Sequence, residues 1–342
     1  MATLAVREAR TERAARTAES LSKLAAIATI ADCIPLFGAG RTLTQIWLAN
    51  LARNTHAGLS RLLEVSGIQR GATPTSRQIG FMLAPRLNSA GRMGSPDDAL
   101  AVFLEPDPAA AIEKVNRLDE LNSRRRELRK SLCKQMIEQT TDVADVCVAY
   151  NPDWPHGLVG IMAARATEHF GVPSFVLGLD PTTNLAYGSG RSVPGFDLVA
   201  AMRACSSLLV KYGGHAAAAG VTLKPEHSSD FREALAAYAR TVEVGREVIK
   251  PETHLDLREY TPEFEQQIRR FEPFGIGNPA PAFRIRKALL GKAKAYASTL
   301  TQGKQTVRVR HGDDVQLDFT QVERDYVVEA TTRGLVFQGV AQ

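Results

Sequence analysis

Hydrophobic positions in the middle of the chain recur with a helical period. The positions that define the stripe follow at spacings of three, four and seven: Ile112, Val115, Leu118, Leu121, Leu128, Leu132 and Met136. Asp107-Pro108 is a typical helix start. The pattern therefore predicts one helix from about residue 108 to 139, on the order of 45 Å long at 1.5 Å per residue. Such a length favours a strut between two domains.

The segment before this helix shows weaker patterns. Residues 1 to about 26 are predicted to form a helix, followed by the apolar segment IATIADCIPL, which Pro35 ends. Short helices are expected around 41–53 and 58–65. LAPRLNSAGRMGSPDDAL is typical of a loop because Pro, Asn and Gly interrupt it. Ser95-Pro96-Asp97 then predicts the start of a short helix.

The pattern changes after about residue 142, where strands and helices alternate. DVADVCVAY, PSFVLGL, LAYGSGRSV and AAAAGVTL are typical of strands, whereas LVGIMAARATEHF, FDLVAAMRACSSLLVKY and residues 226–246 indicate helices. This alternation predicts an α/β sheet. Residues 251–278 are interpreted as a connector. From Phe283 onward FRIRKALLG, TVRVRHG, VQLDF, YVVEATT and GLVFQGV predict a small all-β module.

Composition narrows the class of protein. The 342 residues suit two or three domains, and 44% hydrophobic with 23% charged residues excludes disordered, collagen-like and membrane-spanning chains. The longest N-terminal apolar run contains Asp32 and is shorter than the ~18–20 residues that a spanning helix needs. No secretory signal is found, and four separated cysteines indicate free thiols in a reducing cytoplasm, so a cytoplasmic location is expected. Without a CxxC pair a structural zinc site is disfavoured.

Three short segments contain residues that suit an anion. In Tyr212-Gly213-Gly214-His215 two glycines permit close approach of a ligand, and His215 could donate to a phosphate oxygen; a structural histidine is the alternative. Gly188-Ser189-Gly190-Arg191-Ser192 offers a hydroxyl and a bidentate guanidinium, although glycine-rich strand ends also occur without ligands. Arg92 lies in Arg86-Leu87-Asn88-Ser89-Ala90-Gly91-Arg92-Met93, which could equally be a solvated loop.

Two further features concern charge. Asp32 stands in an apolar segment, where a carboxylate is costly unless it is paired or binds a metal; a helix-capping role is the alternative. The β module has eight cations and no acid between Phe283 and His311: Arg284, Arg286, Lys287, Lys292, Lys294, Lys304, Arg308 and Arg310. With Phe283, Tyr296 and Phe319 as stacking faces, this resembles a single-strand-binding barrel rather than a merely solvated face. The net charge of +5 is a mild indication of the same kind of partner.

Six segments in a fixed order carry a resemblance to a known family. They are ATIADCIPL, LAPRLNSAGRM, WPHGLVGIMAAR, GSGRSVPGFDL, KYGGHAAAAGVTL and FEPFGIGNPAPAF. Together they resemble the RecJ family of single-stranded-DNA-specific exonucleases, within the DHH phosphoesterases, from about residue 20 to the C-terminus. The resemblance implies an α/β protein with a DHH-domain remnant at 1–106, a connecting helix at 107–141 and a DHHA1-like domain at 142–250. It also implies a connector at 251–282 and an incomplete OB-like barrel at 283–342.

The resemblance also implies a function and residue roles. The family removes nucleotides from the 5′ end of single strands in DNA repair and recombination, with Mn²⁺ or Mg²⁺. Asp32 matches a metal-binding acid, while Arg92, Ser189 and Arg191 match phosphate-binding residues. His215 matches a catalytic histidine that also contacts phosphate. Single-stranded DNA is then expected along Arg284, Arg286, Lys287, Arg308 and Arg310. A separate N-terminal DHH domain or repair proteins are the expected protein partners, with no membrane.

The sequence departs from the family pattern at the metal site. Neither a DxD segment nor an Asp-His-His triplet occurs, and the seven histidines are never adjacent. A two-metal site needs several carboxylates held together, which Asp32 alone does not supply. We therefore expect a chain that carries the DNA-binding parts of the enzyme without most of its first domain. The alternative is a catalytically inactive single-strand-binding module or a subunit of a split enzyme; a phosphodiesterase for short oligonucleotides is disfavoured by the barrel.

Overall fold

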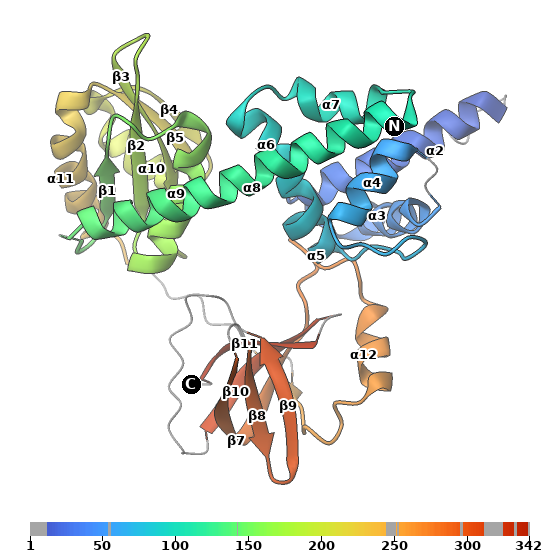
Figure 1. Ribbon diagram of the computed structural model, residues 1–342. Helices are drawn as coiled ribbons and strands as arrows, with labels where there is room; N and C mark the ends of the chain where they lie inside the picture. Colours follow the sequence, from blue (N-terminus) through green and yellow to red (C-terminus); the bar gives the residue numbers. More distant parts are fainter. Residues whose placement is uncertain are drawn as a thin grey trace. The chain divides into compact units, whose positions relative to one another are not determined.

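The computed structural model describes residues 12–53, 56–141, 143–243, 251, 253–294, 297–310, 324–331 and 334–340 (Figure 1). The chain divides into two compact units. Unit 1 consists of Met1–Leu87, Ala99–Arg117 and Ile249–Gln342, and unit 2 consists of Asn88–Asp98 and Leu118–Val248. Within the described residues, no helix combines the length and the apolar character needed to cross a membrane.

The N-terminal part of the chain is helical. Its elements are α2 (Glu12–Ala31), α3 (Gly38–Leu51), α4 (Ala57–Val65), α5 (Ser76–Gln78), the π-helix η1 (Ile79–Leu83), α6 (Ala84–Met93), α7 (Asp97–Leu104) and α8 (Pro108–Gln139). The first helix was expected to end near residue 26. It continues to Ala31 because Ala26 and Ile27 are buried, so packing extends the helix through the apolar segment. Residues 1–11 of that prediction lie outside the described residues.

The predicted loop at LAPRLNSAGRM is wrong, since α5, η1 and α6 form one helical run. The π-helix ends at Leu83, two residues before Pro85, whose missing N–H removes one α-helical hydrogen bond. The helical run therefore does not end at the proline. Its hydrogen-bond pattern changes instead, and the Ala84 N–H donates to the Ile79 carbonyl five residues earlier. Ser89 and Ala90 are fully buried, so tertiary packing outweighs the weak helix propensity of the segment.

The long helix α8 has the predicted bounds, Pro108–Gln139. The Asp107 carboxylate caps it by accepting a hydrogen bond from the Ala110 N–H at 2.7 Å. Residues up to Arg117 belong to unit 1 and those from Leu118 belong to unit 2, so the helix contributes residues to both units. The predicted start of α7 is confirmed as well, because Ser95 Oγ accepts from the Asp97 N–H at 3.2 Å.

Unit 2 is an α/β structure, as the sequence predicted, and its helices cover both faces of one sheet. Its strands are β1 (Cys147–Tyr150), β2 (Ser174–Asp180), β3 (Leu185–Arg191), β4 (Leu209–Gly214) and β5 (Ala218–Leu223), in the order β1-β2-β3-β5-β4. β1 and β2 are parallel, and the other pairs are antiparallel. Helix α9 (His156–Phe170) covers one face of the sheet, while α10 (Leu198–Ala204) and α11 (Ser228–Ala239) cover the other.

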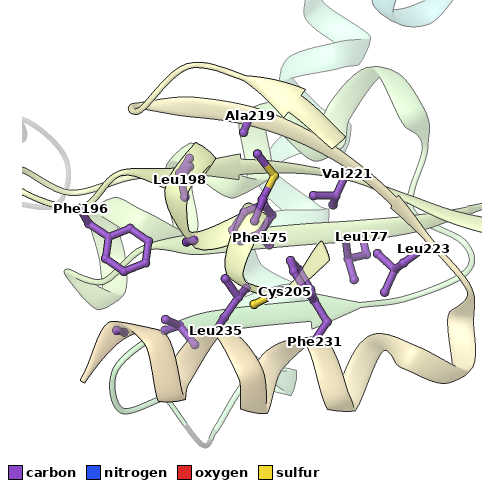
Figure 2. Packing of buried hydrophobic residues seen from close by; sticks show 14 of the residues in the cluster. Phe175, Leu177, Phe196, Leu198, Cys205, Ala219, Val221, Leu223, Phe231 and Leu235 are labelled. Carbon is purple, nitrogen blue, oxygen red and sulfur yellow. The ribbon is translucent and has the colours of Figure 1, made fainter. Parts of the chain in front are cut away.

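The core on the α10 and α11 side is centred on β2 (Figure 2). Phe175 meets Phe231 of α11 edge to face, with ring centroids 5.3 Å apart. Leu177 lies two residues along β2 and points into the same core, whereas Val176 between them packs on the α9 side. This alternation follows from the two-residue period of a strand and fixes which side of β3, the next strand, faces α9.

One helix of unit 2 is shorter than predicted. FDLVAAMRACSSLLVKY was expected to be helical throughout, but α10 ends at Ala204 and residues 209–214 form β4. The reason is pairing, because β4 forms the edge of the sheet and hydrogen-bonds along β5 from Leu209 to Gly214. A local helical pattern does not reveal this long-range partner.

The C-terminal part of unit 1 is a closed barrel. It contains β6 (Thr253–His254), α12 (Pro262–Arg269), β7 (Ala282–Lys294), β8 (Ala297–Gln302), β9 (Gln305–Arg310), β10 (Arg324–Thr331) and β11 (Gly334–Val340). Because β10 pairs with both β11 and β7, the ring β7-β8-β9-β11-β10 closes, so the expectation of an incomplete barrel is wrong. The pattern did not predict β8, and the predicted strand VQLDF lies outside the described residues.

Candidate anion-binding site

Strand β3 presents different side chains to its two faces. Ser189 and Arg191 lie on the side of α9, whereas the glycines between and before them face the core. A Cβ on Gly190 would lie 2.5 Å from the Phe175 ring, and one on Gly188 would lie 2.1 Å from Leu177. These two glycines therefore make room for core side chains.

The first turns of α9 lie over Ser189 and Arg191. The Arg191 guanidinium donates to Ser189 Oγ at 2.9 Å and to the Gly190 carbonyl at 2.8 Å. A Cβ on Gly160 would lie 3.3 Å from Ser189 Oγ and 3.4 Å from Arg191 Nη2, so this position of α9 leaves both groups uncovered. The start of a helix carries a partial positive charge, which favours an anion.

Arg92 reaches the same place from the last turn of α6. Its Nη1 donates to the Gly157 carbonyl in the first turn of α9 at 3.0 Å. The backbones are in direct contact, because a Cβ on Gly157 would lie 2.2 Å from the Arg92 carbonyl oxygen. The structure thus brings Arg92, Ser189 and Arg191 to one helix start; we call these three residues and Gly160 the anion pocket.

The anion pocket concentrates positive charge. Burial lowers the pKa of Arg92 below its ordinary value. Burial also lowers the pKa of Arg191, and the neighbouring positive charge of Arg92 lowers it further. Arginine side chains stay protonated in proteins near neutral pH, so both guanidiniums keep their positive charge. Two half-buried cations that repel each other are stabilised when an anion binds between them.

Arg125 extends this charge and was missed by the sequence analysis. It lies on α8, where burial lowers its pKa first and Arg92, Arg129 and Arg126 lower it further. Its Nη2 donates to Oδ1 of the buried Asn122 at 2.9 Å, while its buried Nε has no hydrogen-bond partner in the described part of the chain. The available signal in the sequence was the polar pair Asn122 and Arg125, at i and i+3 beside the apolar stripe. Only the fold shows that Arg125 lies near Arg92.

His215 lies at the same end of the strands as Arg191. The β4–β5 turn is closed by the His215 N–H, which donates to the Ala218 carbonyl at 2.8 Å, and Gly214 before it has φ +139°. Ala218 of β5 pairs with Arg191 of β3. Two strand spacings therefore separate His215 from Arg191, or about 10 Å. The His215 side chain is exposed, in a position to contact a ligand that extends beyond the anion pocket.

Asp32 belongs to unit 1 and follows directly after the last residue of α2. Its side chain is exposed. Across the described ranges, no group of three or more His, Cys, Asp or Glu side chains could hold a metal ion. Asp32 therefore provides a single carboxylate, whereas a site that holds two Mg²⁺ or Mn²⁺ ions needs several carboxylates.

Among the residues described, the basic side chains predicted to bind DNA lie on two strands of the barrel, β7 and β9. On β9, Arg308 and Arg310 flank the buried Val309 and are both exposed. On β7, Arg286 and Lys287 are consecutive and both exposed, because a bulge there, with Lys287 at φ +46°, shifts the register.

These two groups lie apart along the barrel. Register places Arg308 beside Thr299 and Thr299 beside Gly291, five residues along β7 from Arg286. At about 3.4 Å per residue that is roughly 17 Å. Arg284 lies on β7 with Arg286, next to the buried Ile285.

The predicted stacking face on Phe283 is wrong. Phe283 is buried in the barrel core, where its ring meets Phe264 at 5.6 Å between centroids. Burial follows from its place two residues before Ile285, on the inward face of β7. Tyr296 and Phe319 lie outside the described residues.

The comparisons with known proteins agree with this layout. The model of the DHHA1 domain family matches residues 144–241, which contain Ser189, Arg191 and His215. The RecJ OB domain model matches residues 252–320, which contain the basic groups of β7 and β9. The chain belongs to the RecJ family. Domains of both kinds, in the order expected from the resemblance, decide this assignment.

Relatives of the RecJ family match the chain over most of its length. It is 32% identical to the single-stranded-DNA-specific exonuclease RecJ of Bacillus subtilis over 90% of this chain and 39% of that protein. It is 33% identical to the exonuclease of the same name from Thermus thermophilus over 83% of this chain and 42% of that one. The chain therefore spans less than half the length of these relatives.

Solved structures show the same correspondence. The RecJ of T. thermophilus in complex with Mg²⁺ has a TM-score of 0.76 and 28% identity, covering 94% of this chain and 51% of that one. The Mn²⁺ complex of the same protein has a TM-score of 0.78 and 27% identity, with 49% of that chain covered. About half of each solved chain thus has no counterpart in the residues compared.

Proposed function

We propose that this chain carries the DNA-binding parts of a RecJ-type exonuclease that degrades single-stranded DNA from the 5′ end in repair and recombination. The observation that supports this most strongly is the anion pocket, in which Arg92 and Arg191 meet at the start of α9. A pocket with two guanidiniums and a hydroxyl suits a phosphate. The names of the relatives, single-stranded-DNA-specific exonucleases, supply the class of nucleic acid.

We assign a role to each group of the pocket. Arg191 and Arg92 donate charge-assisted hydrogen bonds to the oxygens of a terminal phosphate, and Ser189 adds a hydroxyl donor. The N–H groups at the start of α9 orient the same phosphate. His215, about 10 Å away by strand spacing, contacts a phosphate further along the strand, next to the bond that is broken.

The barrel holds the strand outside the pocket. Arg284, Arg286 and Lys287 on β7 and Arg308 and Arg310 on β9 bind phosphates of the backbone without reading the bases. Such a division of roles corresponds to a DHHA1-like domain at 142–250 and an OB-like domain at 283–342. The remnant of the DHH domain at 1–106, the helix at 107–141 and the connector at 251–282 complete the proposed domain organisation.

The residues described do not form a site for the Mg²⁺ or Mn²⁺ of the T. thermophilus structures, because they include no group of three or more His, Cys, Asp or Glu side chains that could hold a metal ion. This observation also favours the second candidate function, a catalytically inactive module that binds single strands. The two candidates differ in whether further metal-binding residues join Asp32.

Binding measurements test the pocket. Fluorescence anisotropy would compare single-stranded oligonucleotides with a 5′ phosphate and a 5′ hydroxyl. Arg191→Ala or Arg92→Ala removes a charge-assisted hydrogen bond of about 1.5–3 kcal/mol, so affinity for the phosphorylated end should fall roughly 10- to 150-fold. Arg203→Ala, on the exposed side of α10, is the matched control. Equal losses for both kinds of end would show that the pocket does not bind the terminal phosphate.

A nuclease assay separates the two candidates. The purified chain with Mn²⁺ and 5′-phosphorylated single strands should release no nucleotides, because its described residues bring no cluster of carboxylates together that could hold a pair of metal ions. Addition of a polypeptide with the missing metal ligands should restore release if the chain is part of an exonuclease. Binding without restored release would favour the inactive module.

A further inference from the structure

Arg125 on α8 is a cation to which the proposed function gives no role. Its Nη2 donates to Oδ1 of Asn122 at 2.9 Å, and Asn122 is only 4% exposed, so a buried partner holds the guanidinium in position. Among the residues described, this is the guanidinium's only hydrogen bond, and its buried Nε has none. Donors that stay unpaired inside a protein are costly. A positioned guanidinium with unpaired donors is suited to bind an anion.

The positive charge around Arg125 is not neutralised by nearby acids. Burial lowers the pKa of Arg125 most, and the charges of Arg92 and Arg129 lower it further. In the part of the chain that the structure describes, neither Arg125 nor Arg129 forms an ion pair. Elsewhere on the same helix, Lys114 and Lys134 pair with glutamates at 3.2 and 3.7 Å. The middle of α8 therefore keeps a concentration of positive charge that an external anion would stabilise.

Packing between α6 and α8 brings Arg125 next to Arg92. Ser89 Oγ on α6 donates to the Leu118 carbonyl on α8 at 3.3 Å, and both residues are fully buried. Arg92 lies three residues after Ser89, and Arg125 lies seven residues after Leu118. Each arginine is therefore on the helix face that makes this contact. The interface between the two helices thus continues into a pair of guanidiniums, in agreement with the effect of Arg92 on the pKa of Arg125.

The charged groups around the anion pocket follow a definite order. His215 is connected to Arg191 through β5, whose residue Ala218 pairs with Arg191. Arg125 is connected to the other arginine of the pocket, Arg92, through the contact of α6 with α8. In the proposed function the strand continues from the terminal phosphate towards His215. The group that reaches Arg125 is then a phosphate on the opposite side of the terminal one, beyond the 5′ end of the strand.

We propose that Arg125 and Arg92 form a second phosphate subsite, which binds the outer phosphate of a 5′ end that carries two or more phosphates; this rests on the proposed function. Arg191 and Ser189 then hold the phosphate attached to the sugar, and Arg92 lies between the two phosphates. Asn122 keeps the Arg125 guanidinium oriented, which lowers the entropy lost on binding. The ligand class is a nucleic acid strand with a 5′ diphosphate or triphosphate. Inorganic pyrophosphate contains the same pair of linked phosphates.

Binding to the unmodified chain tests the subsite first. Fluorescence anisotropy in the presence of EDTA would compare single-stranded oligonucleotides of one sequence with a 5′ monophosphate and with a 5′ diphosphate. The diphosphorylated end should bind roughly tenfold more tightly or better, which is the gain expected from one further charge-assisted hydrogen bond. Inorganic pyrophosphate should displace the monophosphorylated strand at a correspondingly lower concentration than inorganic phosphate. This second measurement needs no variant.

A variant of Arg125 tests whether this residue provides the gain. Arg125→Gln removes the charge and keeps an amide that can donate to Asn122. It should weaken binding of the diphosphorylated end roughly tenfold more than binding of the monophosphorylated end. Arg124→Gln is the matched control, because Arg124 is exposed and lies about 100° around the helix from Arg125. It should retain the gain. Thermal melting would verify that both variants fold, and if Arg125→Gln does not, the pyrophosphate measurement decides.

Several outcomes would overturn the second subsite. These are equal affinity for the two kinds of end, a gain that Arg125→Gln retains, or equal displacement by phosphate and pyrophosphate. A 5′-monophosphorylated strand with an uncharged methylphosphonate at its first internucleotide linkage distinguishes the other source of phosphate. If this change weakens binding to the unmodified chain but not to Arg125→Gln, Arg125 binds the strand itself and the assignment to the 5′ end is wrong.

The comparison of 5′-monophosphate with 5′-hydroxyl ends on the same samples tests the proposed function separately. A preference for the monophosphate without a further gain from the diphosphate would reject the second subsite and leave the proposed function standing. No preference for the monophosphate would contradict the role of the anion pocket itself.

Discussion

Gly160→Ala should change the shape of the anion pocket while changing the stability of unit 2 only slightly. The added methyl group would lie 3.3 Å from Ser189 Oγ and 3.4 Å from Arg191 Nη2, distances at which the side chains can give way by a few tenths of an ångström. In the middle of a helix, alanine is about 1 kcal/mol more favourable than glycine. Unit 2 should therefore keep its stability to within about 1 kcal/mol.

Binding should respond much more strongly than stability. The methyl group occupies the space beside both phosphate donors, so at least one charge-assisted hydrogen bond, about 1.5–3 kcal/mol, is lost or lengthened. Affinity for a 5′-phosphorylated single strand should fall roughly 10- to 150-fold, with a much smaller change for a 5′-hydroxyl strand.

Two other glycines provide the matched comparison. A Cβ at Gly157 would lie 2.2 Å from the Arg92 carbonyl oxygen, so Gly157→Ala must push α9 away from α6 and should cost about 1–3 kcal/mol. At Gly213 a Cβ meets nothing within 4 Å, so Gly213→Ala should change stability little.

Stability would be followed by urea unfolding, with the fluorescence of the buried Trp154 reporting on unit 2 in a Trp47→Phe background. Anisotropy with the two kinds of oligonucleotide would follow binding. Undiminished preference of Gly160→Ala for the phosphorylated end would refute the placement of the phosphate beside Gly160. A loss of stability as large as that of Gly157→Ala would refute the packing argument.

Two further predictions concern unit 1. Charge reversal of Arg308 and Arg310 should reduce the slope of log K against log salt by about 1.4 for single-stranded DNA, because each phosphate contact contributes about 0.7. The preference for phosphorylated ends should stay the same. An unchanged slope would show that β9 does not contact DNA. Burial raises the pKa of Glu329, partly offset by a hydrogen bond from Gln338 and by the charge of Arg77. Folding therefore favours the protonated acid, so its contribution to stability is present below the ordinary pKa and is lost as pH rises through the raised one. Glu329→Gln should raise the melting temperature at pH 7 but not at pH 4, and an equal effect at both would contradict the sign.

Local signals in the sequence determined several elements of this protein. The bounds of α8 follow from Asp107-Pro108 and from the apolar stripe, because capping and helical period act within a few residues. The alternation around Val309 correctly predicted that Arg308 and Arg310 share the outward face of a strand. Such features need no knowledge of distant partners.

Only the tertiary structure decided the rest. LAPRLNSAGRM carries loop signals, yet burial of Ser89 and Ala90 makes it helical and places Arg92 against α9. Arg125 joins the charge of the anion pocket from a helix that sequence reasoning treated as a strut. Gly190 is required by the Phe175 ring of a neighbouring strand. In each case the deciding neighbour is remote in sequence, and its steric or electrostatic effect exists only after the chain has folded.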